Sequence, residues 1–168
     1  MERIFDTHAH YDGAAFDEDR EELLDRMPGK GIVRVVNVGA SLDSCRRTLE
    51  LMKRYNYIYG ALGVHPSECA ELDEEGIKWL RRQCQADKCV ALGEIGLDYY
   101  WDEPGREVQK KWFVRQLELA RELKLPVVIH SKSRRDRGSD SLLFLYEGNG
   151  ADFSGYGILF WDRRGSDL

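Results

Sequence analysis

The sequence has no long apolar segment. No apolar run in its 168 residues approaches the length of about 18 residues that a membrane-spanning helix needs. The amino-terminus shows no charged region followed by a long apolar core, which argues against a signal peptide. Both absences lead us to expect a cytoplasmic protein that does not use a membrane as a partner.

Cysteine is scarce, and its spacing carries no signature of a site. No C-x-x-C motif occurs, and the cysteines fall in segments of helix or strand character: Cys45, Cys69, Cys84 and Cys89. We therefore expect reduced thiols that are buried or half-buried.

Positive charge is not in excess. The chain has 25 lysine and arginine residues against 30 aspartate and glutamate residues, and its formal net charge is −5. This balance argues against a protein that coats nucleic acid along its whole surface. It leaves open a local basic groove, or a contact to phosphate through a metal ion.

What the sequence does contain is a regular alternation of strand and helix signals. Short apolar strands are predicted at residues 3–6, 32–38, 57–62, 89–92 and 126–129. Helices are predicted between them at residues 17–27, 42–54, 73–85 and 106–123. Five βα units in strict alternation predict a parallel α/β sheet with covering helices. No G-x-G-x-x-G motif follows the first strand, which argues against a dinucleotide-binding Rossmann unit.

The polar motif residues favour one α/β architecture over the others. They lie just after the predicted carboxyl ends of the strands, where (β/α)8 barrels of the TIM-barrel type place their active sites. We therefore predict such a barrel, of which the chain supplies about the first five βα units. Because eight units take about 250 residues, the outer edges of the first and fifth strands are expected to be unpaired, which favours aggregation.

Histidine is rare, and its placement is the strongest functional signal. All of the histidines fall at predicted strand ends: His8, His10, His65 and His130. Side chains alternate along a strand, so His8 and His10 point to one face and form a chelating pair. Neutral imidazole is a common ligand of catalytic metal ions. A single H-x-H pair is more often two polar residues at a strand end, but the clustering of all four histidines favours a metal site.

A carboxylate joins the histidines. Glu94 follows the predicted fourth strand, between Gly93 and Gly96, and a carboxylate can bridge two divalent cations. Two ions would activate a water molecule and neutralise the charge of an in-line displacement at phosphorus. Taken alone, Glu94 is equally well explained as an ion-paired loop residue and His65 as a turn residue. His130 alone is better explained as the cap of a strand.

Four motifs, in this order and at this spacing, resemble the TatD family of metal-dependent deoxyribonucleases in the amidohydrolase-like superfamily. They are DTHAH at 6–10, GVHP at 63–66, GEIGLDYY at 93–100 and PVVIHS at 126–131. The resemblance covers residues 1 to about 132. It implies hydrolysis of phosphodiester bonds in DNA, as a 3′→5′ exonuclease or a related activity, with two divalent ions such as Mg²⁺, Mn²⁺ or Zn²⁺.

The resemblance also implies which residues bind the ions. His8 and His10 would bind the first ion, and His130 would bind the second. Glu94 would bridge both ions.

The same resemblance implies which residues meet the substrate. His65 would lie near the ions and contact the substrate phosphate or the attacking water, so Glu94 and His65 are the candidate catalytic residues. Asp98 and Tyr99 would shape the substrate cleft or support the metal ligands.

The resemblance is lost after about residue 132. The family carries a further histidine one strand later and an aspartate in a Glu-Thr-Asp motif, and neither follows His130 here. Lys132 stands where the family has an arginine. We therefore predict a partial metal-hydrolase barrel at 1–132 and an atypical tail at 133–168, of the kind that a frame shift or a truncated gene model produces.

Three alternatives to an active nuclease remain open at this point. The first is that the chain is a catalytically defective fragment. The second is that it is a shortened relative that completes its barrel as a homodimer. The third alternative is another metal hydrolase on the same barrel, acting on an ester or amide. The DTHAH motif is compatible with that alternative, whereas GEIGLDYY is not typical of it.

Overall fold

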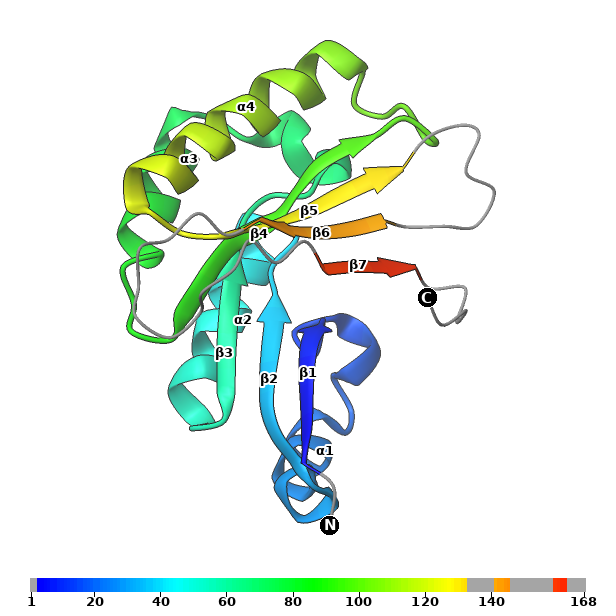
Figure 1. Cartoon of the computed structure of the whole chain (residues 1–168), viewed down its shortest axis with the longest axis vertical. Coiled ribbons are helices and arrows are strands. Elements are labelled where there is room, and N and C mark those ends of the chain that lie inside the picture. Colours follow the sequence, from blue (N-terminus) through cyan, green and yellow to red (C-terminus); the bar gives the residue numbers. More distant parts are fainter. Residues whose placement is uncertain (1–2, 133–140, 146–158, 163–168) are drawn as a thin grey trace.

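A single sheet organises the computed structural model, which describes residues 3–132, 141–145 and 159–162 (Figure 1). Strands that follow one another in the sequence are neighbours in the sheet, in the order β1-β2-β3-β4-β5-β6-β7. These strands span Ile4–Ala9, Ile32–Val38, Ile58–Leu62, Cys89–Asp98, Val127–Lys132, Ser141–Leu145 and Leu159–Asp162. The first five strands are parallel, as predicted, and curl into half a barrel.

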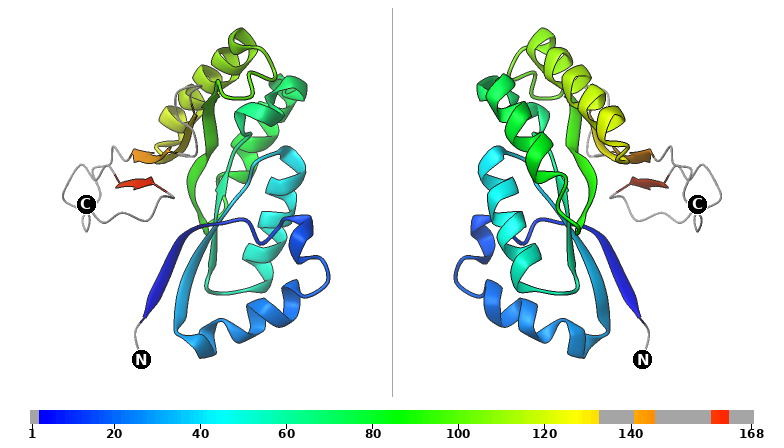
Figure 2. Two further views of the ribbon diagram at one scale, coloured as in Figure 1. Left: turned by 90° about the vertical axis from the view of Figure 1, so that its right-hand side faces the viewer. Right: turned by 90° about the vertical axis from the view of Figure 1, so that its left-hand side faces the viewer.

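The helices cover one face of this curved sheet (Figure 2). They are α1 (Arg20–Arg26), α2 (Leu42–Arg54), α3 (Glu74–Gln83) and α4 (Arg106–Leu123), with the 3-10 turns η1 (Ala14–Phe16), η2 (Pro28–Lys30) and η3 (Pro66–Glu71). A sequential strand order with helices on one face is that of a TIM-type barrel, whereas a doubly wound fold has helices on both faces. The predicted architecture is therefore confirmed. None of the helices in the described ranges is both long and apolar enough to span a membrane.

Side-chain caps explain where two of the helices begin. The Ser41 hydroxyl accepts a hydrogen bond from the Ser44 N–H at 3.1 Å before α2, and the Asp73 carboxylate accepts one from the Gly76 N–H at 2.8 Å before α3. The predicted bounds of α2 and α4 are confirmed. The helix predicted at 17–27 is too long, because Asp19 has a non-helical backbone and α1 begins only after it.

The main core lies between the helices and the sheet. Side chains that are completely buried there include Leu24, Ile58, Leu62, Ile77, Leu80, Leu92 and Leu119. A smaller cluster consists of Val36, Val38, Ala61, Ala91 and Val128. Its members alternate along the strands with residues of the main core, so they lie on the opposite face of the sheet. All four cysteines are buried free thiols, as predicted.

Strands β1, β4 and β5 extend beyond their predicted carboxyl ends, which corrects the placement of four site residues. His8, Glu94, Asp98 and His130 lie within strands and not just after them. The apolar pattern stops early because these residues are polar, but the backbone pairing continues. Gly96 is paired with His130 in the register between β4 and β5.

The outer edge of β5 is paired, contrary to the prediction. Strand β6 lies antiparallel to β5, with Ser141 opposite Ser131 and Leu145 opposite Val127, and β7 lies antiparallel to β6. An antiparallel strand can follow its neighbour without a crossover helix. Another strand could therefore follow β5 although the helix signals end at residue 132. Among the described residues, β1 has a partner on one side only, as predicted. The rest of the predicted tail lies outside those residues, and its division from the barrel stays a prediction.

Candidate metal centre

Two histidines at the end of β1 converge on one point. The Nε2 atoms of His8 and His10 lie 3.0 Å apart. Both face the same carboxylate oxygen of Glu94, Oε2, at 3.6 and 3.7 Å. Two nitrogens that bind an ion at about 2.1 Å and at right angles are about 3.0 Å apart. The pair therefore has the spacing of a chelate, as its strand period predicts.

A backbone carbonyl fixes the proton of His10. Its Nδ1 lies 2.7 Å from the carbonyl oxygen of Val38, which only accepts hydrogen bonds. Nδ1 therefore carries the proton, and Nε2 keeps its lone pair toward His8 and Glu94. Metal-binding histidines commonly donate their second nitrogen in this way. The Nδ1 atom of His8 is buried without a hydrogen-bond partner in the described part of the chain, so this ring makes its polar contacts through Nε2.

Glu94 presents one oxygen to each of two histidine pairs. Its Oε2 faces His8 and His10, and its Oε1 lies 3.2 Å from Nδ1 of His130. Burial raises the pKa of Glu94, but hydrogen bonds from His130 and His8 outweigh this effect and hold the pKa well below its ordinary value. Glu94 is therefore an ionised carboxylate, although only 6% of it is exposed.

His130 lies between two buried carboxylates. Its Nδ1 faces Glu94, and its Nε2 lies 3.3 Å from Oδ2 of Asp98. The ring of His65 packs edge to face against the ring of His130, with a centroid separation of 4.2 Å. The second pair of histidines therefore comes from two different strand ends, after β3 and within β5.

His65 is protonated on the other nitrogen. The backbone N–H of Ser67 donates to Nδ1 of His65 at 3.1 Å, so Nδ1 is an acceptor and the proton of the neutral ring is on Nε2. Burial, and secondly the proximity of His130, lower the pKa of His65 to about 4, although Glu94 and Asp98 act in the opposite direction. At neutral pH, His65 is thus an uncharged ring whose Nε2–H can donate a hydrogen bond.

Two groups of potential ligands share Glu94. They are His8, His10 and Glu94, and His65, Glu94 and His130; within each group one donor atom from every residue lies within 4.8 Å of the others. Imidazole and carboxylate together suit divalent ions such as Zn²⁺ and Mn²⁺. The first group fits an ion well, because the free lone pair of His10 points into it. The second group fits less well, because His65 uses its Nδ1 lone pair for Ser67.

A glycine allows the two strands of the centre to approach each other. Gly96 has a φ of 148°, and a Cβ atom at this position would overlap the backbone carbonyl of His130. Any side chain here would push β5 away from β4. Gly96 therefore permits the close pairing that sets His130 beside Glu94.

Comparisons with known proteins identify the family of the chain. The family model "TatD related DNase" matches residues 5–150. The chain belongs to the TatD family. This match confirms the family that the four motifs indicated.

Individual relatives of this TatD-family chain match over most of its length. It is 38% identical over 144 residues to the uncharacterized metal-dependent hydrolase YabD of Bacillus subtilis, covering 86% of this chain and 55% of YabD. It is 31% identical over 134 residues to the 3′-5′ ssDNA/RNA exonuclease TatD of Cronobacter sakazakii, covering 80% of this chain and 51% of the relative.

A solved structure shows the same fold. The crystal structure of the TatD homologue YjjV from Escherichia coli K12 superposes with a TM-score of 0.71 at 34% identity, covering 80% of this chain and 53% of YjjV. The chain thus spans about half the length of the relatives that it matches.

In this TatD-family chain, Asp98 connects the centre to the loop after β4. Its Oδ2 faces His130, and its Oδ1 accepts the backbone N–H groups of Tyr100 at 3.0 Å and Trp101 at 3.2 Å. Tyr99 lies in the same loop, and its ring stacks with the guanidinium of Arg106 at 4.5 Å. The structure thus places Asp98 in contact with His130, whereas the Tyr99 ring contacts Arg106.

Sequence reasoning missed the groups that fix the histidines. Ser67 follows His65 by two residues in a short helical turn, so its N–H was a readable local signal. The carbonyl of Val38 comes from the neighbouring strand β2, and no pattern within β1 indicates it. Backbone partners of this kind depend on the register between strands.

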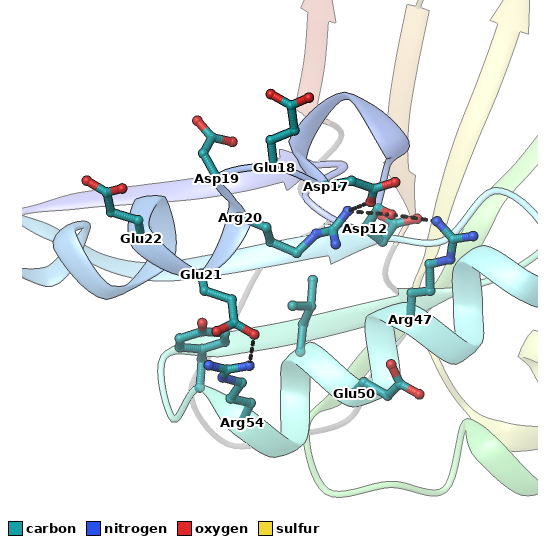
Figure 3. Close-up of a pocket in the computed structure, with 12 residues that line it drawn as sticks. Asp12, Asp17, Glu18, Asp19, Arg20, Glu21, Glu22, Arg47, Glu50 and Arg54 are labelled. Atoms are coloured by element: carbon teal, nitrogen blue, oxygen red, sulfur yellow. Dashed lines mark hydrogen bonds and ion pairs between the residues drawn. The ribbon is translucent and has the colours of Figure 1, made fainter.

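The groove between α1 and α2 is separate from the histidines (Figure 3). Its charged lining residues are Asp12, Asp17, Glu18, Asp19, Glu21, Glu22, Glu50, Arg20, Arg47 and Arg54. All three of its arginines are paired: Arg20 with Asp17, Arg47 with Asp43 and Arg54 with Glu21. Carboxylates outnumber arginines here, so the groove disfavours a phosphate and is not a candidate substrate site.

Proposed function

We propose that this TatD-family chain carries the metal centre of a divalent-metal-dependent hydrolase that cleaves phosphodiester bonds in DNA, as a 3′→5′ exonuclease. The observation that supports this proposal most strongly is the position of Glu94. It is buried and ionised, with one oxygen facing a chelating histidine pair and the other facing His130. The name of the Cronobacter sakazakii relative, a 3′-5′ ssDNA/RNA exonuclease, supports the same activity.

The proposal assigns two ions to the centre. His8, His10 and Glu94 would hold the first ion, and Glu94 and His130 would hold the second. Bound divalent ions supply Lewis acidity and lower the pKa of a bound water, which makes a nucleophile at neutral pH. Glu94 contacts both histidine pairs, because its Oε2 faces His8 and His10 and its Oε1 faces His130.

His65 acts on the substrate and not on an ion. Its Nδ1 is occupied by the Ser67 N–H, so the available group is the Nε2–H. A neutral N–H donor can bind an oxygen of the scissile phosphate and stabilise the charge that develops there during attack. Asp98 orients His130 through the contact at 3.3 Å and holds the adjacent loop. Tyr99 forms part of the substrate cleft.

A second candidate function is supported by the weaker second group of ligands. His130 has a carboxylate at each ring nitrogen, and His65 offers no free lone pair at Nδ1. The second candidate is a protein that binds one ion at His8 and His10 but does not hydrolyse DNA. A homodimer that completes the centre and a location in the cytoplasm also stay predictions.

One experiment separates the two candidates. The whole chain is freed of metal, titrated with Mn²⁺ by calorimetry, and incubated with a 5′-labelled single-stranded oligonucleotide in Mn²⁺, Mg²⁺ or EDTA. The proposal expects stepwise shortening from the 3′ end that requires metal and disappears in Glu94→Gln. Binding of one ion without shortening supports the second candidate. Shortening that survives in Glu94→Gln shows a contaminating nuclease and overturns the proposal for this preparation.

A further inference from the structure

The loop at 99–105, between β4 and α4, exposes two aromatic side chains beside the metal centre. Trp101 is 67% exposed and Tyr100 is 41% exposed. Their rings pack edge to face with a centroid separation of 4.9 Å, so the two residues form one surface. A large exposed aromatic surface on a loop that adjoins a candidate active site is a typical feature of a binding site.

Buried polar groups hold this loop at both ends. Gln109 of α4 is only 1% exposed. Its Oε1 accepts the N–H of Asp98 at 2.8 Å, and its Nε2 donates to the carbonyl oxygens of Asp98 at 3.0 Å and Pro104 at 2.7 Å. The Asp98 carboxylate also accepts the N–H groups of Tyr100 and Trp101. The aromatic surface is therefore preorganised, which lowers the entropic cost of binding a ligand.

The same carboxylate joins the aromatic surface to the metal centre. One oxygen of Asp98 holds the loop backbone, and the other lies 3.3 Å from Nε2 of His130. The Asp98 side chain thus fixes the position of Trp101, and of a ligand that contacts it, relative to His130.

Cations accompany the aromatic rings although the chain as a whole is acidic. The Lys132 Nζ lies 5.1 Å from the centroid of the Tyr100 ring. The Arg106 guanidinium lies 4.5 Å from that of Tyr99 and also pairs with Asp102 of the loop at 3.1 Å. Aromatic rings interspersed with lysine and arginine form the surfaces that bind single-stranded nucleic acids, because bases stack on the rings and phosphates lie near the cations.

We propose that Trp101, with Tyr100, is a stacking platform for a nucleobase of a single-stranded nucleic acid whose phosphodiester reaches the metal centre. This inference rests on the proposed function. A base inside a duplex is stacked and paired already, so the platform selects strands with unpaired ends. Stacking is tolerant of sequence because every base has a π face, so the platform discriminates little among the bases.

The test compares intact and abasic strands on the whole protein. Binding of fluorescently labelled, phosphorothioate-linked single strands is measured by anisotropy in Mn²⁺, with bases present or with abasic sites near the 3′ end. Trp101→Ala is expected to weaken binding of the intact strand about 10-fold to 100-fold and to leave binding of the abasic strand unchanged. Trp101→Phe should restore most of the loss, because it keeps an aromatic face. Phe5→Ala is the matched control, since Phe5 is 53% exposed at the amino end of β1.

Two outcomes would overturn the platform. One is an equal loss for intact and abasic strands in Trp101→Ala, which would indicate a contact other than base stacking. The other is a wild-type protein that binds the intact and abasic strands equally well, or binds neither. That result would favour a protein as the partner of Tyr100 and Trp101. Hydrolysis is followed in parallel. A chain that prefers intact strands but does not cleave DNA refutes only the proposed function, and one that cleaves DNA without any effect of Trp101→Ala refutes only the platform.

Discussion

The two histidine pairs on either side of Glu94 are built in different ways. His8 and His10 come from one strand end, and their Nε2 atoms face each other at 3.0 Å. His65 and His130 come from different strand ends, and their rings pack edge to face. The first pair points its ring nitrogens at a single oxygen of Glu94. In the second pair, one ring is held by Ser67 and the other lies between two carboxylates.

This difference suits the same residue type to two purposes in one site. A backbone carbonyl at Nδ1 leaves His10 with a lone pair that can bind a metal, whereas a backbone N–H at Nδ1 leaves His65 with a proton that can bind an anion. The main-chain group behind each ring therefore decides whether it acts as a ligand or as a donor. The following predictions test that distinction.

The largest effect is expected at the residue that both pairs share. Glu94→Gln keeps the size of the side chain but removes its charge, so both groups lose their anionic ligand. We expect the affinity for Mn²⁺ to fall by more than about 100-fold in calorimetry, since even outer partners of metal ligands contribute about 10-fold to 100-fold. Glu50→Gln, an exposed position on α2, is the control. An unchanged affinity in Glu94→Gln would exclude Glu94 as a ligand.

Removing one histidine from each side should give unequal results. His10→Ala is expected to weaken the tighter Mn²⁺ site about 10-fold to 100-fold, because it breaks the chelate. His130→Ala should weaken that site less than His10→Ala does, since its ring contacts Glu94 only through the other oxygen. Calorimetric titration of both variants, with circular dichroism to verify folding, provides the comparison. The reverse order of effects would make the second pair the principal site.

A buried polar network supports the loop that follows His10. Asn37 is completely buried; its Nδ2 donates to Asp12 and to Thr48, both at 2.8 Å, and its Oδ1 accepts the N–H of Tyr11 at 2.7 Å. Asn37→Ala leaves these groups unsatisfied, so we expect the free energy of unfolding in urea to fall by about 1–3 kcal/mol. Thr48→Val removes one of the three bonds and should cost less. Equal losses in the two variants would contradict a shared network centred on Asn37.

The smallest effect concerns the pH dependence that His65 adds. Its pKa is about 4 in the folded protein and 6.5 ordinarily, so between these values the unfolded chain binds a proton that the folded protein does not. This contribution to stability is complete above pH 6.5 and is lost as the pH falls toward 4. Between pH 6.5 and about pH 5, in EDTA, we expect the wild type to lose on the order of 1 kcal/mol more than His65→Gln, given partial solvent screening. Urea unfolding at the two pH values measures the difference, and identical losses would show that His65 titrates normally.

Much of the fold could be predicted because its signals are local. The alternation of apolar strands and amphipathic helices gave five parallel strands, and it gave the bounds of α2 and α4. The period of two along β1 placed His8 and His10 together. Each of these features depends on residues that are close in the sequence.

The remaining features depend on contacts between distant elements. The carboxyl end of β4 was predicted too early, because Gly93 and Glu94 interrupt its apolar run. The pairing with β5, which continues as far as Asp98 opposite Lys132, shows that the strand goes on. The pairing of β6 with β5 could not be predicted either. The prediction relied on alternating strands and helices, and no helix signal follows β5. Gln109 carries no sequence signal either, since its three bonds to Asp98 and Pro104 become visible only when α4 is placed against β4.

The position of Glu94 in the chain also sets the order of events during folding. Both donor groups include Glu94, so neither is complete until β4 has docked beside the strands that precede it. Pairing such distant segments is slow compared with forming a helix, because the intervening chain must first be ordered. An ion bound by these groups would therefore stabilise the assembled sheet and would not template its early stages. Metal uptake during refolding should follow formation of the sheet and report when its first four strands have come together.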